Sequence, residues 1–260
     1  MRILYFGNNW LGYRILKWLK EEHEDIIALV IHPKDRQKFS GEIISISGLD
    51  SSHIFRGDQL QSPITIGAIR DLRPEIGISV MFGYIIPAEL LSIFPKGCIN
   101  LHPSLLPYNR GAFPNVWAIV DETPAGVTMH FIDEGIDTGD IIAQREVTVE
   151  PTDTGETLYS KLEKSAFTLF IETWPLIKAG NIHRKRQRKD EGTFHRLRDV
   201  QRIDHIELDK FYKAKDLINI LRARTFPPYP GAYFEIDGRR VYLRLQLYYD
   251  DELKKECPNR

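Results

Sequence analysis

Short apolar runs alternate with amphipathic stretches over the first hundred residues of this chain. Continuous apolar runs predict buried strands at residues 3–6, 26–31, 76–80 and 97–101. Between them, apolar residues at helical spacing predict helices over 11–22, 64–72 and 87–93. Strands that alternate with helices are typical of a doubly wound, mostly parallel sheet. We therefore predict a Rossmann-like α/β fold for the first part of the chain.

The pattern changes in the second half. Residues 128–132 and 140–149 alternate between apolar and polar positions, which predicts antiparallel strands, and 156–179 form a long amphipathic helix opened by Thr154. The basic run over 184–189 marks a change in composition, and we place a boundary there between a large domain, 1–187, and a small one, 188–260. In the small domain we predict a helix over 214–224 and a hairpin of 233–236 with 240–247 around Asp237-Gly238.

Composition and charge narrow the class of protein. The chain has 260 residues, 42% of them hydrophobic and 27% charged, with a formal net charge of −1. With a net charge this close to zero, the protein has no overall electrostatic attraction to nucleic acid. No apolar run approaches the length of a membrane span. Cys98 and Cys257 are too few for a disulfide framework, and no His or Cys pair has metal-ligand spacing. We expect a cytoplasmic protein that binds no nucleic acid, membrane or metal.

The loop from Gly7 to Gly12 follows a predicted strand and opens a helix, where backbone N–H groups meet anionic ligands. The dinucleotide fingerprint fails because Asn9 stands where the second glycine is needed. The phosphate loop also fails, since Tyr13-Arg14 follows Gly12. A ligand-binding loop and a tight structural turn remain equal alternatives.

The most informative motif is Asn100-Leu101-His102-Pro103-Ser104-Leu105-Leu106-Pro107, followed by Arg110-Gly111 and later by Gly135-Ile136-Asp137-Thr138-Gly139. Side chains two apart on a strand share a face, so Asn100 and His102 point toward one crevice. Asn donates to an oxyanion, His moves a proton, and Asp137 can orient and charge the imidazole. This combination is suited to acyl transfer to an amine.

These motifs, over about residues 1 to 180, resemble the formyltransferases that use N10-formyltetrahydrofolate. The resemblance implies catalytic roles for Asn100, His102 and Asp137, with formyl-folate as cosubstrate. It also implies a folate site in two loops whose backbone groups hold the pterin. The residues concerned are Phe82, Gly83, Tyr84, Ile85 and Ile86 in one loop and Phe131, Asp133, Glu134 and Gly135 in the other.

We expect a direct transfer without a covalent enzyme intermediate. The amide of Asn100 and a protonated His102 would donate hydrogen bonds to the oxyanion, and such a donor is typically worth about 3–4 kcal/mol in the transition state. A carboxylate nearby raises the pKa of a histidine, so Asp137 would favour the charged imidazole. Asp137 is also a candidate acceptor of the amine proton.

The segment after residue 206 suggests the acceptor. It resembles the tail of sugar N-formyltransferases, which implies a nucleotide-linked amino-deoxysugar, dTDP-4-amino-4,6-dideoxyglucose in the first place, for lipopolysaccharide O-antigen synthesis. UDP-aminoarabinose is the near alternative. The basic run favours methionyl-tRNA as a further alternative, although the part after residue 190 is shorter than expected for such enzymes. A formyltetrahydrofolate hydrolase and a non-catalytic folate or nucleotide-sugar binder are readings from other classes.

Two further expectations concern substrate contacts and assembly. The candidate substrate-binding residues are Asn9, Trp10, Arg110, Gly111, Arg222, Arg224 and Tyr229. Tyr229 would offer a flat face to a pyrimidine and the arginines would lie near phosphate, while packing of the small domain is an equal alternative for the aromatic residues. A two-stranded hairpin is not stable alone, so we expect it to pack on the large domain or a second subunit, and we predict a homodimer.

Overall fold

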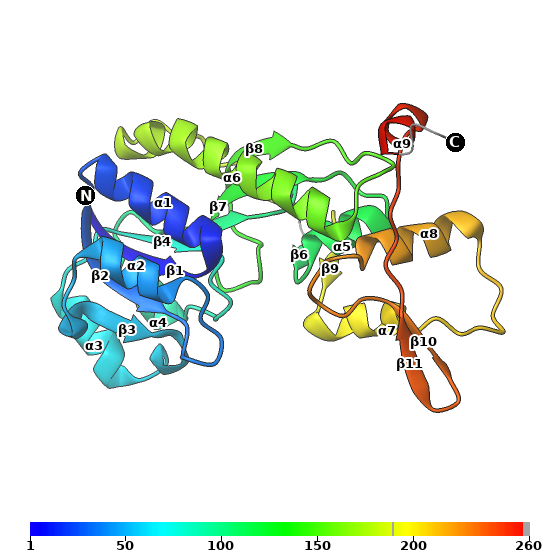
Figure 1. The fold of residues 1–260 in the computed structure, drawn as a ribbon. Coiled ribbons are helices and arrows are strands. Elements are labelled where there is room, and N and C mark those ends of the chain that lie inside the picture. The colour runs from blue at the N-terminus through cyan, green and yellow to red at the C-terminus, as the bar shows by residue number, and fades with distance from the viewer. Residues whose placement is uncertain (189, 257–260) are drawn as a thin grey trace. The chain divides into compact units, whose positions relative to one another are not determined.

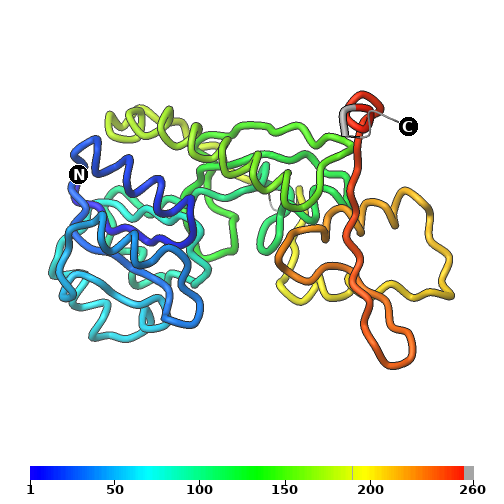
Figure 2. Tube along the Cα trace, in the orientation of Figure 1, coloured from blue at the N-terminus to red at the C-terminus, as the bar shows by residue number. Residues whose placement is uncertain are grey.

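The computed structural model describes residues 1–188 and 190–256, so Lys189 of the basic run and Cys257 lie outside the described residues. The chain forms two compact units (Figure 2). Unit 1 comprises 1–102, 127–145 and 165–189, and unit 2 comprises 103–126, 146–164 and 190–260. The domain boundary between residues 187 and 188 stays a prediction.

Unit 1 is built on a seven-stranded sheet with the order β3-β2-β1-β4-β5-β7-β8. The pairs β3–β2, β2–β1, β1–β4 and β4–β5 are parallel, and β7 is antiparallel to β5. The predicted α/β class with a mostly parallel sheet is confirmed. The strands are β1 (Arg2–Gly7), β2 (Asp25–Ile31), β3 (Ile54–Arg56), β4 (Ile76–Val80), β5 (Cys98–His102), β7 (Gly126–Phe131) and β8 (Ile141–Glu146).

The central strands are apolar on both faces because helices cover both. Every residue of β4 is buried, as is every residue of β1 after Arg2. On one face, Leu4, Phe6 and Val30 share a core with Ile69 of α3 (Pro63–Asp71) and Leu90 of α4 (Ala88–Leu91). In Figure 1, α1 (Asn9–Glu21) lies on the opposite side of the sheet from α3.

The same face as α1 also receives the second half of α6 (Gly155–Lys178). The ring of Trp18 meets the ring of Phe170 edge-on, with centroids 5.9 Å apart. At the other end of α6, the hydroxyl of Thr154 accepts a hydrogen bond from the backbone N–H of Thr157 at 3.3 Å, which confirms the predicted cap. The remaining short elements of unit 1 are α2 (Ser40–Ser47), η1 (Ser51–His53) and η2 (Gly57–Gln59).

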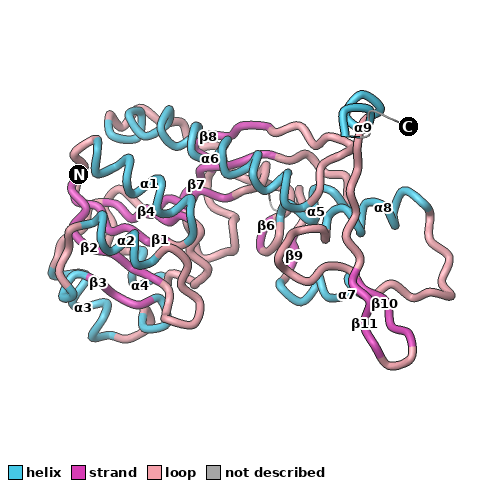
Figure 3. Tube along the Cα trace, viewed as in Figure 1, coloured by secondary structure: helices cyan, strands magenta, loops and turns pink. Residues whose placement is uncertain are grey.

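Unit 2 is mainly helical, with short strand pairs (Figure 3). A parallel pair joins β6 to β9, and an antiparallel hairpin joins β10 to β11. The hairpin turns at Asp237 and Gly238, which have φ of 50° and 71°, as the sequence predicts. The elements are β6 (Arg110–Gly111), α5 (Pro114–Val120), β9 (Phe194–His195), η3 (Leu197–Val200), α7 (Gln201–Asp204), α8 (Ala214–Ala223), β10 (Tyr233–Ile236), β11 (Arg239–Tyr242) and α9 (Asp250–Glu256).

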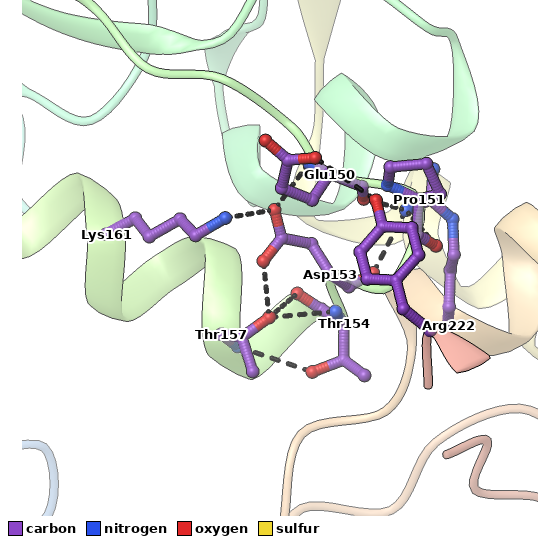
Figure 4. Close-up of polar contacts among 8 residues, drawn as sticks. Glu150, Pro151, Asp153, Thr154, Thr157, Lys161 and Arg222 are labelled. Atoms are coloured by element: carbon purple, nitrogen blue, oxygen red, sulfur yellow. Dashed lines mark hydrogen bonds and ion pairs between the residues drawn. The ribbon is translucent and has the colours of Figure 1, made fainter. Parts of the chain in front are cut away.

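A buried arginine ties α8 to the loop that precedes α6 (Figure 4). The guanidinium of Arg222 donates hydrogen bonds to the backbone carbonyls of Glu150, Pro151 and Asp153 at 3.0, 3.3 and 3.0 Å. The carboxylate of Asp153 in turn pairs with Lys161 of α6 at 2.6 Å. All three carbonyls accept from one nitrogen of Arg222, Nη1, so they share its two hydrogens, while Nε donates to the side-chain oxygen of Asn219 at 2.9 Å.

The fold differs from expectation in the end of one hairpin strand and in several elements. The second hairpin strand, predicted over 240–247, ends at Tyr242, because beyond it the chain leaves β10 and Leu245 donates its N–H to the side chain of Thr225 at 2.9 Å. The helices α2 and α5 and the strand β3 were not predicted. Helix α5 is buried nearly all round, so it lacks the polar face that identifies a surface helix.

Candidate active site

Four polar side chains share one face of β5 and β7 within unit 1. Asn100 lies directly opposite His130 in the antiparallel register, and His102 lies opposite Thr128. Residues at i and i+2, and residues directly opposite each other, project from the same face of a sheet. His102, Thr128 and His130 are each at most 6% exposed. The sheet therefore carries a compact polar patch beside its apolar core.

His130 fixes the orientation of the Asn100 amide. Its Nδ1–H donates to the backbone carbonyl of Phe131 at 2.8 Å, so in the neutral ring Nε2 is the acceptor. The Nδ2 atom of Asn100 lies 3.2 Å from this Nε2 and donates to it. A carboxamide NH₂ has two hydrogens. One N–H of Asn100 is therefore bonded to His130, and the second can donate a hydrogen bond to an oxygen atom on which negative charge develops.

The loop after β7 folds back over this patch and brings in Asp137. Its Oδ2 lies 3.7 Å from Nε2 of His102, and its Oδ1 lies 3.5 Å from Nε2 of His130. Both distances are within ion-pair range and longer than a hydrogen bond. The structure thus brings together all three predicted catalytic residues, together with His130, which was not predicted as a site residue.

The Asp137 loop has a demanding backbone. Asp137 itself adopts a left-handed conformation, with φ of 55°. At Gly139 an added Cβ would lie 1.9 Å from the carbonyl oxygen of Phe131, so only glycine allows the loop to close this tightly. At the other end, Asp133 accepts hydrogen bonds from the N–H of Gly135 at 3.0 Å and the hydroxyl of Thr138 at 2.7 Å. The Gly-x-Asp-Thr-Gly spacing therefore reflects a closed, internally bonded turn.

The predicted folate loop, Phe82 to Ile86, follows β4 and is supported by His32. The N–H of Gly83 donates to Nε2 of His32 at 3.1 Å. The imidazole also meets the rings of Phe82 and Tyr84 edge-on, at centroid distances of 5.3 and 5.1 Å. Burial lowers the pKa of His32, and a backbone hydrogen bond with Arg36 opposes that effect. The neutral ring therefore holds the loop.

Both predicted folate loops expose apolar side chains next to backbone polar groups. Ile85 is 74% exposed and Ile136 is 49% exposed, while Asp133, Glu134 and Gly135 are exposed at the turn between the strands. Phe131 is buried at the start of this loop, where the guanidinium carbon of Arg184 lies 3.7 Å from its ring centroid. Exposed apolar surface beside a few polar groups is typical of a ligand site.

The candidate substrate residues Asn9 and Trp10 lie in unit 1, where β1 passes into α1. Asn9 is left-handed, with φ of 65°, and its N–H donates to the carbonyl of Lys38 at 2.8 Å. Its side-chain oxygen accepts from the N–H of Trp10 at 2.9 Å. Trp10 is half-buried, with the guanidinium carbon of Arg14 5.4 Å from its ring centroid. Both lie at the carboxyl end of a parallel strand, where ligands bind in such sheets.

The other candidate substrate residues lie in unit 2. Arg110 is buried and donates to the carbonyl of Glu191 at 3.3 Å. At Gly111, φ is 88° and an added Cβ would lie 2.3 Å from the carbonyl oxygen of His195. Tyr229 is 47% exposed and meets the ring of Phe226 edge-on at 5.5 Å. These positions are compatible with both the packing and the ligand-binding alternatives.

The arginines expected near phosphate have partners within the protein. Arg222 is buried on the three carbonyl groups described above. Arg224 forms a two-point pair with the carboxylate of Asp204, in which Nη2 lies 3.1 Å from Oδ2. Both guanidiniums therefore have a structural explanation, and their predicted contact with phosphate stays a prediction.

The described residues contain neither a metal-binding cluster nor a membrane-spanning helix. Within 1–188 and 190–256, no group of three His, Cys, Asp or Glu side chains has an arrangement suited to a metal ion. In the same part of the chain, no helix combines the length and apolar character needed to cross a membrane.

Comparison with known proteins identifies the family. Residues 1–174 match the model of the formyl transferase family, and residues 199–249 match that of the N-formyltransferase dimerization C-terminal domain. The protein belongs to the formyl transferase family, as the resemblance of its motifs indicates. It is an enzyme of the formyltransferase class.

Individual relatives differ in their acceptor. A methionyl-tRNA formyltransferase from Caldanaerobacter subterraneus is 32% identical, over 94% of this chain and 79% of its own. A 4-N formyltransferase from Francisella tularensis is 28% identical with a TM-score of 0.77, over 95% of this chain and 98% of its own. A formyltransferase from Anoxybacillus kamchatkensis, in complex with UDP-4,6-dideoxy-4-formamido-L-AltNAc and tetrahydrofolate, is 34% identical with a TM-score of 0.58. This match covers 78% of this chain and 89% of the Anoxybacillus chain.

The neutral state of His32 predicts a pH dependence of stability. Because burial lowers its pKa in the folded protein, the stability that His32 contributes is fully present above the unfolded-state pKa of about 6.5 and is lost as pH falls below it. The free energy of unfolding should decrease by at most about 1.4 kcal/mol per pH unit in that range. Urea titrations of wild type and His32→Gln between about pH 5 and 8 measure this.

His32→Gln keeps an acceptor for Gly83 but cannot take a proton, so this part of the slope should disappear. His183→Gln, which removes an exposed histidine, is the matched control and should keep the slope. Equal slopes in wild type and His32→Gln would show that His32 is not a neutral buried support.

Proposed function

We propose that this protein transfers a formyl group from N10-formyltetrahydrofolate to the amine of a nucleotide-linked amino-deoxysugar. The observation that carries the chemistry is the convergence of Asn100, His102 and Asp137 on one face of β5, with His102 and Asp137 3.7 Å apart. An amide donor, an imidazole and a carboxylate are the groups that acyl transfer to an amine requires.

Two loops of unit 1 support the proposed folate site. Ile85 is exposed in the loop Phe82 to Ile86, and Ile136 is exposed directly after the segment Phe131 to Gly135, beside polar residues of both loops, which suits the flat, polar-edged ring of a pterin. The relatives also support a folate cosubstrate, because the Anoxybacillus enzyme is in complex with tetrahydrofolate. When bound, formyl-folate supplies an activated formyl carbon, and attack by an amine places negative charge on the formyl oxygen.

Asn100 and His102 would stabilise that charge. His130 accepts one N–H of the Asn100 amide. The second N–H can therefore donate to the oxyanion without a change of rotamer. A protonated His102 would donate the other hydrogen bond, and the carboxylate of Asp137 favours this protonation electrostatically. Donors that are oriented before the reaction cost no reorganisation when the charge develops.

Asp137 would also accept the proton that the attacking amine loses. Its carboxylate is 13% exposed, so an amine or a water molecule can reach it and pass it the proton. The amine gains positive charge as it attacks and loses it with this proton. The bond between the formyl carbon and N10 then breaks, and tetrahydrofolate leaves with a proton on N10, which Asp137 or His102 would return.

The C-terminal region supports a sugar acceptor. Residues 199–249 match a domain described for N-formyltransferases. The Francisella 4-N formyltransferase aligns over 98% of its length, and the Anoxybacillus enzyme is in complex with a UDP-linked 4-formamido sugar. We favour dTDP-4-amino-4,6-dideoxyglucose as the acceptor and bacterial surface polysaccharide, such as O-antigen, as the destination of the product. The reaction would take place in the cytoplasm.

Methionyl-tRNA is the second candidate acceptor, because the curated relatives at 30–34% identity are methionyl-tRNA formyltransferases. The basic segment before residue 189 would then contact phosphate groups. UDP-aminoarabinose is a third amine of the sugar class. Water as acceptor would make the protein a hydrolase, and binding without turnover would make it a regulator.

Substitution of the two donors tests the chemical mechanism. Asn100→Ala and His102→Ala should each lower kcat by about 10²–10³-fold, because each removes one hydrogen bond to the transition state. Steady-state assays of tetrahydrofolate release, with thermal melts of the same preparations, measure this. Asn181→Ala, at an exposed asparagine, should keep kcat. Near-normal kcat in either variant would remove that residue from the proposed mechanism.

A panel of acceptors tests the substrate. The purified protein with N10-formyltetrahydrofolate should formylate a dTDP-4-amino sugar with a kcat/KM at least about tenfold above that for UDP-aminoarabinose and for methionyl-tRNA. Mass spectrometry of the product identifies the amide formed. Exclusive formylation of methionyl-tRNA would overturn the sugar assignment, and folate release without any acceptor would indicate a hydrolase.

The hairpin supports assembly into a homodimer. Its two faces differ, because Arg240 packs on the ring of Tyr233 at 4.5 Å and pairs with Glu235 at 2.9 Å on one of them. The opposite face carries Ile236 and Val241, which are 52% and 39% exposed. Apolar side chains on an exposed hairpin are typical of an interface between subunits.

We therefore expect a dimer in solution that depends on this face. Ile236→Ser combined with Val241→Ser should convert the dimer to a monomer at micromolar concentration, because burial of these side chains stabilises the interface. Light scattering after size exclusion measures the mass. Glu235→Gln, on the other face, should leave the dimer intact. A monomeric wild type would refute the prediction.

A further inference from the structure

The basic segment 184–188 forms part of the wall around the Asp137 loop. Lys185 exchanges two backbone hydrogen bonds with Ile141, at 2.8 and 2.9 Å, in an antiparallel bridge at the start of β8. Arg184 stacks over the ring of Phe131 at the end of β7. Backbone pairing and ring contact fix this segment beside the two strands that flank the loop.

Within this segment, Gln187 points inward. It is 8% exposed, whereas Arg186 and Arg188 on either side of it are exposed. Its Nε2 donates to the backbone carbonyl of Asp137 at 2.9 Å and to that of Gly139 at 2.8 Å. A carboxamide nitrogen has two hydrogens, so one side chain binds both ends of the turn that presents the carboxylate.

This turn needs external support. Asp137 has a left-handed backbone, which is unfavourable for a residue with a side chain, and such conformations persist where the surroundings hold them in place. The carboxylate reaches His102 and His130 through only two bonds from that backbone. A small rotation of the turn would therefore change its distances of 3.7 and 3.5 Å to the two imidazoles.

We propose that Gln187 is a positioning residue for Asp137: its amide holds the Asp137–Gly139 turn so that the carboxylate faces His102 and His130. Gln187 does not touch the reacting atoms. This inference rests on the proposed catalytic role of Asp137, and it is independent of which amine is the acceptor.

The test compares wild type with Gln187→Met, which keeps the length of the side chain and removes both donors. kcat should fall by about tenfold to a hundredfold, because small displacements of a catalytic group have effects of that size, while KM for both substrates stays within about threefold. Gln201→Met makes the same change at an exposed glutamine and should keep kcat.

The pH profile separates positioning from general loss of structure. Asp137 and His130 both face His102, and a displaced Asp137 would favour the protonated imidazole less. The alkaline limb of kcat in Gln187→Met should therefore move to lower pH by about half a unit or more. A kcat within twofold of wild type, or a reduced kcat with an unmoved limb, would overturn the proposal.

Hydrogen exchange provides a readout that needs no substrate. Backbone amides of residues 133–140 should exchange faster in Gln187→Met, while those of β1 and β4 stay unchanged. Equal exchange at 133–140 would contradict the inference.

If Gln187→Met does not fold, Gln187→Asn, which has a shorter side chain with the same amide, is used for the same comparisons, with smaller effects expected. A wild type inactive on aminosugars but active on methionyl-tRNA would overturn only the proposed acceptor, and the variants are then compared on that tRNA.

Discussion

The candidate active site depends on one closely constrained contact, the approach of the Asp137 carboxylate to two histidines on the face of the sheet. β5 and β7 supply His102 and His130 from rigid, paired strands, but Asp137 comes from a loop. That loop is closed at one end by Gly139 and held from outside by Gln187. A left-handed aspartate is thus kept in a position that its own conformational preference does not favour.

Placing polar groups on a buried face has consequences for both stability and chemistry. His130 and Thr128 are almost fully buried, and buried polar atoms are costly unless they are hydrogen-bonded. Thr128 accepts a hydrogen bond from the amide of Gln144 at 3.0 Å, and His130 bonds to Phe131 and Asn100. The network that satisfies these groups also orients the Asn100 amide. The same bonds therefore serve folding and, in the mechanism we propose, the preorganisation of the oxyanion donor.

The two units contribute differently to the function we propose. Unit 1 contains the polar cluster, both candidate folate loops and Gln187, so the proposed formyl transfer chemistry depends on this unit. Unit 2 contains the region that matches the dimerization domain and is held together by internal contacts, such as those of Arg222 and Arg224. Arg222 and Arg224, which the sequence suggests as phosphate ligands, are bound here by carbonyl and carboxylate groups of the protein itself, and their contact with phosphate stays a prediction.

The sequence by itself determined the fold class and most central elements, because β1, β2 and β4 are continuous apolar runs and α1 and α6 have clear apolar stripes. It also pointed to Asn100, His102 and Asp137, through a motif whose spacing reflects strand geometry and a glycine-closed turn. It did not reveal α5, which is buried on all sides, or the end of β11, which pairing decides. Only the tertiary structure brought in His130 and Gln187, since the first is recognised by its register opposite Asn100 and the second by hydrogen bonds to residues 50 and 48 positions away. Contacts between distant parts of the chain leave no periodic signal in a single sequence, and these two side chains take their roles from such contacts.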